Sequence, residues 1–482
     1  MNGTGPIAAT GFAARLSPAR IALLCAVAAL AVSLPTMRNG FAIDDIAVFV
    51  EQPSTHSLRN IPQFFGRGWG MGTTNQQSLA MNTRYYRPLP TTLGALEYAV
   101  FGLRPAGFHL TSALLHATTA ALACLLLWQV TAGNALASLL GGLLFAIHPV
   151  QSEAFCAACY QTTLLAGLFS TLALVWFGRV LQRGPRIGPL VVIGVSLLFG
   201  LMSKEDSFVV PLLALAWALI LRPAGWRRAL LFSILAMGIS CAVVLALRSA
   251  FLTPSKLVYF PPDRPVWVVL TMVRIAALYL ELLLMPLRLC PFYDWFIIGY
   301  ETGPSWDVAV GATILGLCLA LVVVGVKRFP VVAIGILWVL LALAPVSQVI
   351  PIIVVAAERF LYIPMLGVAL IAGLLLQLGL AHARAAGQAR LAAVAVAVVL
   401  LGCATRTLAR VPDWRNDETV NRATAQAFPE TPTPLLNLAA YYQKVEGNTA
   451  KALQALADAE KRSPGWKPAI ERAAQLRSGM SR

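Results

Sequence analysis

Residues 308–326 read VAVGATILGLCLALVVVGV, and Lys327 and Arg328 follow at once. This run contains no charged side chain, and its length is close to the ~20 residues with which an α-helix crosses the hydrocarbon core of a bilayer. Similar apolar runs recur from Ile21 to Leu408. The sequence therefore predicts an all-α, polytopic membrane protein.

Composition excludes a soluble multidomain protein. Of the 482 residues, 58% are hydrophobic and 12% are charged, whereas soluble domains carry about 25% charged residues. The short polar gaps between the apolar runs hold much of the net charge of +16. This distribution is typical of membrane topology, so the charge does not indicate nucleic acid as a partner.

The apolar runs predict about 11 transmembrane helices. They lie near 20–35, 107–131, 135–149, 161–181, 188–203, 206–221, 229–248, 305–326, 330–346, 361–380 and 391–409. With the N-terminus in the cytoplasm, the basic gaps face inward and all 21 carboxylates lie outside or at the outer membrane face, as the positive-inside rule requires. The apolar segment 266–286 is expected on the outer surface or as a re-entrant segment, because a twelfth span would place Lys327 and Arg328 outside.

Three regions outside the spans are long enough to have their own structure. The first outer loop, 37–105, is expected to carry interfacial helices, since it is rich in the aromatic residues that settle at the headgroup level. A connection of this length favours a function. The second outer region, 249–305, has the same aromatic character. We expect a membrane domain over 1–411 and an external tail over 412–482.

The tail has a spacing similar to that of tetratricopeptide helices. The matching positions are Leu438, Tyr442, Ala452, Leu456, Ala459 and Pro464. One clear repeat and one degenerate repeat are visible, fewer than the three or so that such arrays need for stability of their own. We therefore expect the tail to be stabilised by packing against the membrane domain or against a partner. An ordinary helical hairpin is the alternative.

Asp44 and Asp45 form an acidic pair about nine residues after the first span, on the outer side. Adjacent carboxylates at a membrane face are costly unless they meet water, a cation or a substrate. A solvated pair in an aqueous loop is the alternative. The apolar neighbours Phe41, Ile43 and Ile46 are expected to raise the basicity of the pair, so that one carboxylate could accept a proton while the other orients the reacting group or a metal.

Other charged residues emerge from the spans at the same face. They are Arg87, His148, Glu153, Lys204, Glu205, Glu358 and Arg359. An interfacial ion pair explains Glu358–Arg359 taken alone, and a snorkelling side chain explains Lys204. Their common depth favours a shared site instead. Cations there would suit a phosphate leaving group, whose negative charge grows as its bond breaks.

The order of motifs resembles the TMTC-type protein O-mannosyltransferases of the GT-C superfamily. The motifs are the DD pair, YRPL, GFHLTSALLHA, LLFAIHPVQSEA, SKED and AERFLYIP, followed by the tetratricopeptide-like tail, from about Phe41 to Pro464. The resemblance implies a GT-C-like bundle and an inverting transfer of a sugar from a polyprenyl-phosphate donor to a hydroxyl acceptor. The chain departs from the family in its shortened repeats and in Gln151, where the family often has histidine or a similar residue. No residue identifies the sugar as mannose.

The resemblance also implies roles for the residues that match its motifs. Asp44 and Asp45 are expected to be catalytic. The donor phosphate is expected at Arg87, Lys204 and Arg359, and a supporting polar site at His148, Glu153, Glu205 and Glu358. A divalent metal could bind at the acidic pair, although two hard ligands do not identify an ion. Cys156 and Cys159 form a single CxxC, which is poor support for zinc.

The expected acceptor is a Ser/Thr hydroxyl of a protein, with a lipid or polysaccharide as the alternative. The expected location is the inner (cytoplasmic) membrane of the cell, with the active site and the C-terminus on the external side and an envelope protein as a partner of the tail. A secondary transporter and a non-catalytic scaffold are the two alternative classes. A secondary transporter would place charges near the bilayer midplane, whereas these cluster at one face. A non-catalytic scaffold would tolerate substitution of the acidic pair.

Overall fold

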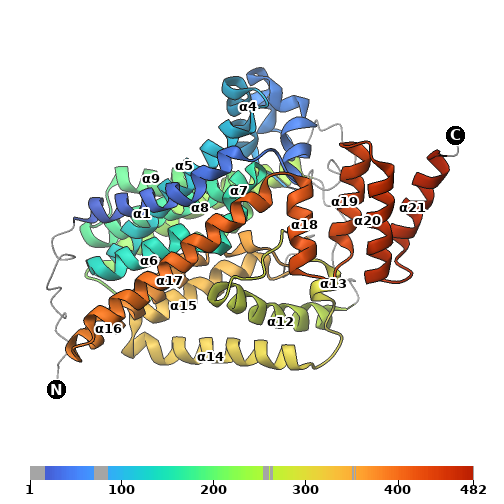
Figure 1. Ribbon diagram of the computed structural model, residues 1–482. Helices are drawn as coiled ribbons and strands as arrows, with labels where there is room; N and C mark the ends of the chain where they lie inside the picture. Colours follow the sequence, from blue (N-terminus) through green and yellow to red (C-terminus); the bar gives the residue numbers. More distant parts are fainter. Residues whose placement is uncertain are drawn as a thin grey trace.

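In the computed structural model the described residues are 17–69, 85–252, 260, 264–291, 293–349, 352 and 354–480. Parts of both predicted outer regions, and both ends of the chain, thus lie outside them. Throughout these ranges the regular structure is helical and contains no strand (Figure 1). The all-α fold class predicted from the apolar runs is confirmed.

Each of the predicted spans coincides with a helix. These helices are α1 (Pro18–Ser33), α5 (Pro105–Val130), α6 (Ala135–Ile147), α8 (Gln161–Arg183), α9 (Ile187–Ser203), α10 (Val210–Leu221), α11 (Trp226–Phe251), α14 (Trp306–Arg328), α15 (Pro330–Leu343), α16 (Met365–Ala385) and α17 (Ala389–Arg410). Among the described residues, 8 helices are long and apolar enough to cross a membrane, or up to 9 if the bent pair formed by α6 and Pro149–Cys156 is one span. The chain is a multi-pass membrane protein, and the number of crossings stays a prediction.

α12 (Pro265–Leu284) is one of the membrane-length helices, although we expected it on the outer surface or re-entrant. Near its start, the ring of Trp267 lies 5.8 Å from that of Tyr300, which belongs to the second outer region. At its end, the carbonyl of Leu283 bonds Nε2 of His148 at 3.1 Å. Both ends therefore contact residues that the topology places at the outer side. Length and composition allow α12 to cross the membrane, so its place on the outer surface stays a prediction.

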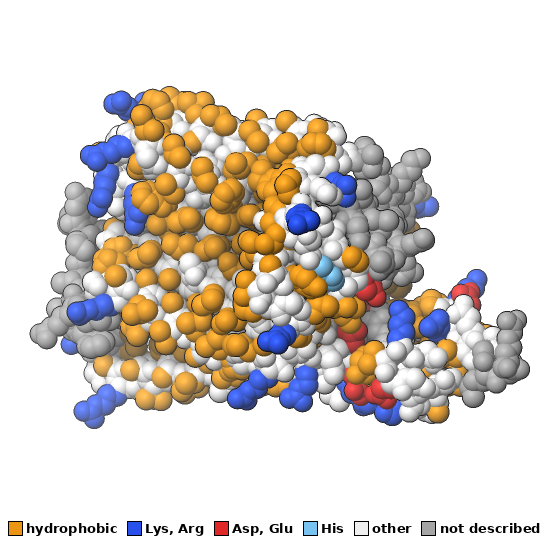
Figure 2. All heavy atoms as spheres, turned by 90° about the horizontal axis from the view of Figure 1, so that it is seen from above, with side chains coloured by type: hydrophobic (Ala, Val, Ile, Leu, Met, Phe, Trp, Pro, Cys, Tyr) orange, Lys and Arg blue, Asp and Glu red, His pale blue; other side chains and the backbone are white. Residues whose placement is uncertain are grey.

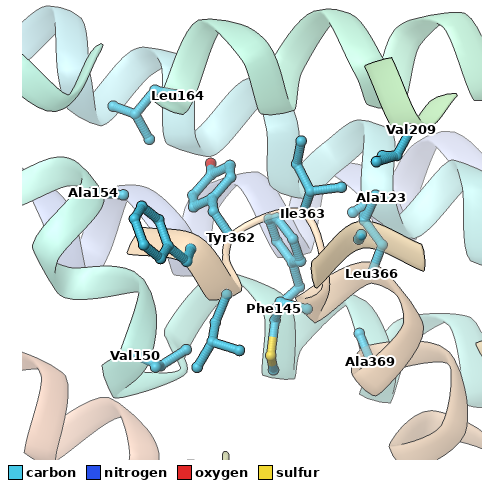
Figure 3. Close-up of a cluster of buried hydrophobic side chains, with 14 of the residues drawn as sticks. Ala123, Phe145, Val150, Ala154, Leu164, Val209, Tyr362, Ile363, Leu366 and Ala369 are labelled. Carbon is cyan, nitrogen blue, oxygen red and sulfur yellow. The ribbon is translucent and has the colours of Figure 1, made fainter. Parts of the chain in front are cut away.

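Close glycine contacts fix α16 against α6. A Cβ atom on Gly373 would lie 2.2 Å from the carbonyl oxygen of Ala137, and one on Gly141 would lie 2.4 Å from that of Ala369. Small residues let membrane helices approach to van der Waals contact. The segment before α16 is thereby held beside the segment that follows α6. Figure 3 shows the buried cluster at this junction, which includes Phe145, Val150, Ala154, Leu164, Tyr362, Ile363 and Leu366.

The tail forms four helices at one end of the molecule (Figure 1). They are α18 (Asp417–Ala427), α19 (Thr433–Lys444), α20 (Thr449–Arg462) and α21 (Lys467–Met480). Leu438 and Tyr442 of α19 share a buried cluster with Ala452, Leu456 and Ala459 of α20, so five of the six positions of the predicted repeat spacing pack together.

The tail also packs against the membrane part, as we expected of so short an array. Thr431 donates a hydrogen bond of 2.6 Å to Asp294, and Arg288 pairs with Glu430 at 3.0 Å. In Figure 2, hydrophobic side chains cover the middle of the molecule, and the Asp and Glu side chains visible on that face lie toward the tail. On this face the acidic side chains therefore gather at the same end of the molecule as the tail.

Candidate active site

The acidic pair lies just beyond α1, where the chain leaves the membrane part and turns. The carboxylate of Asp45 is fully buried. One of its oxygens accepts the N–H of Cys159 at 2.7 Å, and the other accepts the N–H of Ala42 at 3.2 Å. Asp44 is exposed and accepts a hydrogen bond of 3.4 Å from the hydroxyl of Tyr160. The two carboxylates therefore have different positions: Asp45 joins two backbone segments, and Asp44 is accessible.

Both carboxyl groups have raised pKa values, as the apolar neighbours predict. Burial raises the pKa of Asp45 to about 6, and the N–H groups of Cys159 and Ala42 act in the opposite direction. The pKa of Asp44 is also raised, first because the surrounding protein limits hydration of its carboxylate, although Arg359 and Tyr160 lower it. A higher pKa makes a carboxylate a better proton acceptor.

Glu153 and Tyr160 hold Arg359 beside Asp44. Its guanidinium pairs with the buried carboxylate of Glu153, and its backbone N–H donates to the same carboxylate at 2.6 Å. Glu153 belongs to the short helix α7 (Ser152–Cys156), and Arg359 to the 3₁₀ helix η10 (Glu358–Leu361). The guanidinium also lies 4.3 Å from the ring centroid of Tyr160. Arg359, Tyr160 and Asp44 therefore form one continuous cluster.

Lys204 lies next to this cluster. Its ammonium pairs with Asp206 at 2.6 Å and donates to the Thr163 hydroxyl at 3.2 Å. Lys204 and Arg359 both lie near the ring of Phe360, with centroid distances of 5.1 Å to the ammonium and 5.5 Å to the guanidinium. Burial lowers the pKa of Lys204, and Asp206 acts against that shift.

Glu205 joins two arginines from different parts of the chain. It pairs with Arg87 at 2.9 Å and with Arg248 at 2.6 Å. Burial by itself would raise the pKa of Glu205, but the two arginines lower it to about 2. Arg87 also lies 5.1 Å from the centroid of the Trp69 ring, and both residues line the same cleft. Two cations share one carboxylate, so this group retains a net positive charge.

His148 and Glu358, which we expected in a supporting polar site, bind backbone instead. Besides its bond to Leu283, His148 accepts the N–H of Val150 at 3.3 Å. Glu358 accepts the N–H of Cys290 at 2.6 Å and the hydroxyl of Tyr293 at 3.2 Å. His148 therefore holds the last turn of α12, and Glu358 holds the segment that follows it. The structure brings the other predicted site residues together in the cluster around Asp44 and the two neighbouring charged groups.

Sequence reasoning missed Tyr160 and Arg248. Tyr160 is the first neighbour of Asp44, yet the two residues are 116 positions apart, and no motif connects them. Arg248 carried a usable signal, because an arginine at the outer end of a span runs against the positive-inside rule. Over the described ranges, no group of three or more His, Cys, Asp or Glu side chains is placed to hold a metal ion.

The fold and this cluster define a multi-pass, all-α membrane protein with a charged site at one end of its helices. No family model matches the chain. It is similar to the protein O-mannosyl-transferase TMTC3 of Mus musculus, 23% identical over 429 residues that cover 79% of this chain and 44% of that protein. Human TMTC2 is 30% identical over 162 residues, which cover 32% of this chain and 18% of that protein.

The Drosophila melanogaster protein Tmtc3 is 25% identical over 461 residues, covering 78% of this chain and 48% of that protein. The chain thus spans less than half the length of these relatives. Among solved structures, the Archaeoglobus fulgidus oligosaccharyltransferase aligns with a TM-score of 0.49 and 14% identity, over 81% of this chain and 53% of that one. The resemblance to the TMTC proteins that the motifs predict is confirmed.

Proposed function

We propose that this protein is a membrane glycosyltransferase. It transfers a sugar, mannose or another hexose, from a polyprenyl-phosphate-linked donor to a hydroxyl group, with inversion. The observation that carries the proposal is the carboxylate of Asp44, an exposed residue, close enough to Arg359 for the guanidinium to lower its pKa, in a chain similar over 79% of its length to a protein named as an O-mannosyl-transferase. One group accepts a proton and the other stabilises negative charge, as sugar transfer from a phosphate requires.

Asp44 accepts the proton of the acceptor hydroxyl while that oxygen attacks the anomeric carbon. The bond between the anomeric carbon and the phosphate oxygen breaks on the opposite side, and its electron pair leaves with the lipid phosphate. Asp45 is the positioning residue of the pair, because the N–H groups of Ala42 and Cys159 already bind its two oxygens. This division favours Asp44 as the residue that contacts the acceptor.

The cations contribute unequally to binding the leaving phosphate. Arg359 and Lys204 are each matched by one carboxylate, from Glu153 and Asp206. Arg87 and Arg248 share the single carboxylate of Glu205. This group therefore has the strongest uncompensated attraction for a phosphate, and we assign Arg248 to the donor-binding cations beside the three predicted from sequence.

We further propose that the site and the tail face the exterior of the inner membrane, with the N-terminus in the cytoplasm. The division into a membrane domain over 1–411 and a tail over 412–482 belongs to this proposal. The acceptor is a protein Ser/Thr hydroxyl or a glycan hydroxyl. An envelope protein is the proposed partner of the tail.

The proposal is tested with purified protein in lipid nanodiscs, supplied with undecaprenyl-phosphate mannose and with envelope proteins as acceptors. Asp44→Asn should abolish transfer at unchanged yield and melting temperature. Asp458→Asn is the matched control, since that carboxylate pairs with Lys461 at the surface of the tail. Mass increments on Ser/Thr peptides would support a protein acceptor. Increments confined to glycan or lipid would show that the acceptor is a glycan or a lipid instead. Undiminished transfer by Asp44→Asn contradicts the assignment of the catalytic residue.

A further inference from the structure

The start of the tail is tied to the loop that carries Asp44. The carboxylate of Asp417, the first residue of α18, accepts the N–H of Ile43. Two more hydrogen bonds join the same segments: the N–H of Gly40 donates to the carbonyl of Arg415 at 2.9 Å, and the side chain of Asn39 donates to the carbonyl of Val411 at 2.9 Å. The segment 411–417 therefore forms one wall of the loop 39–43.

Ile43 has a backbone conformation that needs such support. Its φ angle is +54°, in the left-handed region that β-branched residues rarely adopt. Residues held in this region persist where the surrounding structure over-determines them, and they concentrate at functional sites. Ile43 directly precedes Asp44, so its conformation determines the direction in which the Asp44 carboxylate points.

Asp417 is not needed to cap its own helix. The side chain of Asn416 accepts the N–H of Thr419 at 2.9 Å, and the Thr419 hydroxyl accepts the N–H of Asn416 at 3.1 Å. This reciprocal capping box caps the N-terminus of α18 without the Asp417 side chain. The carboxylate of Asp417 can therefore reach across to Ile43. The alternative is that the negative charge of Asp417 only stabilises its own helix, through a favourable interaction with the helix dipole. An experiment has to distinguish this effect from the positioning of Ile43.

The other contacts of the loop 39–43 come from different elements than the bond between Ile43 and Asp417. His109 bonds the carbonyl of Gly40 at 3.1 Å, on the side of α5. Asp45 binds the N–H of Ala42 and thus holds the loop from the side of Cys159. The peptide that directly precedes Ile43 is held at both ends: its carbonyl, that of Ala42, accepts the N–H of Asp45 at 3.1 Å, and its N–H donates to Asp417, which is its contact with the tail.

We infer that Asp417 is a positioning residue for the proposed sugar transfer: through the N–H of Ile43 it holds the carboxylate of Asp44 toward the accessible side of the site. The inference rests on the proposed function and extends it, because it makes the first turn of the tail a part of the active site. Removing the tail therefore removes a wall of the site as well as a binding module.

Three variants separate positioning from charge. Asp417→Asn keeps an acceptor oxygen for the N–H of Ile43 and loses the charge. Asp417→Glu keeps the charge and moves the acceptor outward by one methylene group. Asp417→Ala loses both. Glu418→Ala is the matched control, since it removes a carboxylate from the same first turn without touching the loop.

We expect kcat to fall about 10- to 100-fold in Asp417→Ala and Asp417→Glu, because small misplacements of a catalytic group have effects of this size. KM for undecaprenyl-phosphate mannose should change less than about threefold, since the donor contacts other residues. Asp417→Asn and Glu418→Ala should keep kcat within about threefold of the wild type. Amide hydrogen exchange in a peptide covering 39–45 should rise in Asp417→Ala and stay low in Asp417→Asn.

The outcomes distinguish this inference from the proposed function. If Asp44→Asn retains transfer, the proposed function fails. If Asp44→Asn is inactive while Asp417→Ala and Asp417→Glu keep full kcat, the function stands and the inference is overturned. An order in which Asp417→Glu is more active than Asp417→Asn also overturns it, because charge rather than geometry would then matter. The comparison of the Glu and Asn variants remains decisive if Asp417→Ala does not fold.

Discussion

The hydroxyl of Tyr160 donates a hydrogen bond of 3.4 Å to the carboxylate of Asp44. The ring of the same tyrosine lies 4.3 Å from the guanidinium of Arg359. Tyr160 thus links the proposed proton acceptor to one of the proposed phosphate-binding cations. It also offers a way to tune the pKa of Asp44 without changing its carboxylate.

Tyr160→Phe should shift the acid limb of the pH–rate profile to higher pH. The hydrogen bond from Tyr160 lowers the pKa of Asp44, so its loss raises that pKa, and Asp44 is then protonated and inactive at a higher pH. Arg359 and Asp417 keep their charges in this variant. We expect kcat at neutral pH to fall about 2- to 10-fold. Tyr293→Phe, which removes a hydrogen bond to Glu358 instead, should leave the acid limb in place.

Glu153→Gln should destabilise the protein strongly. Removing one partner of a buried ion pair typically costs about 3–5 kcal/mol, because the other charge remains buried and unpaired. Glu153 is fully buried and its partner Arg359 nearly so. Thermal unfolding in nanodiscs measures the effect. Glu430→Gln breaks the exposed pair with Arg288 and should cost no more than about 1 kcal/mol; equal losses in the two variants would contradict the prediction.

Arg248→Gln should weaken donor binding more than it slows chemistry. The substitution leaves Arg87 and Glu205 as a neutral pair and removes the net positive charge of the group. We expect KM for undecaprenyl-phosphate mannose to rise about 10-fold or more, since lost charge pairing at a binding site typically costs about 2 kcal/mol. Arg227→Gln, at the other end of α11, is the control. An unchanged donor KM in Arg248→Gln would remove this residue from the donor site.

Glu205 should make stability depend on pH in the acid range. Its pKa is lowered from 4.5 to about 2 in the folded protein, so the unfolded chain takes up the proton first as pH falls. The stabilisation by the ionised group is therefore complete above pH 4.5 and is lost as pH falls toward 2. The melting temperature of the wild type should decline over this window more steeply than that of Glu205→Gln. Parallel curves would show that Glu205 is not responsible.

Gly373→Ala should disrupt the contact between α16 and α6. The added Cβ would lie 2.2 Å from the carbonyl oxygen of Ala137, and such overpacking costs about 1–3 kcal/mol. Gly379→Ala, in the same helix, meets no atom within 4 Å and should leave the melting temperature unchanged or raised. Equal melting temperatures for the two variants would contradict the close approach of the helices.

The apolar runs predict the helices well because each run carries its own signal. A stretch such as 308–326 has to be a helix in lipid, since its backbone groups find hydrogen-bond partners only within the segment. The predicted spans and the helices therefore agree closely. The placement of α12 is harder to predict, because length and composition do not distinguish a helix that crosses the membrane from one that returns to the same side. Its end contacts, through Trp267 and Leu283, come from segments distant in the sequence.

Most of the candidate site could also be predicted from the sequence, because ionisable residues at a membrane face cost free energy and therefore stand out. Asp44, Glu153, Lys204 and Arg359 lie in one region, as we expected. His148 has the same polarity and depth in the sequence, yet it binds the backbone at Leu283 and Val150. Polarity and depth alone could not separate these two kinds of residue.

The sequence by itself determined that the chain is an all-α membrane protein with carboxylates and cations gathered at one face, since hydropathy and charge act locally along the chain. Only the tertiary structure decided which charges meet. Glu153 and Arg359 are 206 positions apart, and Ile43 and Asp417 are 374 positions apart. Such pairings depend on how α6 and α16 pack and on where the tail returns, and these relations arise from side-chain contacts between distant helices rather than from any local pattern.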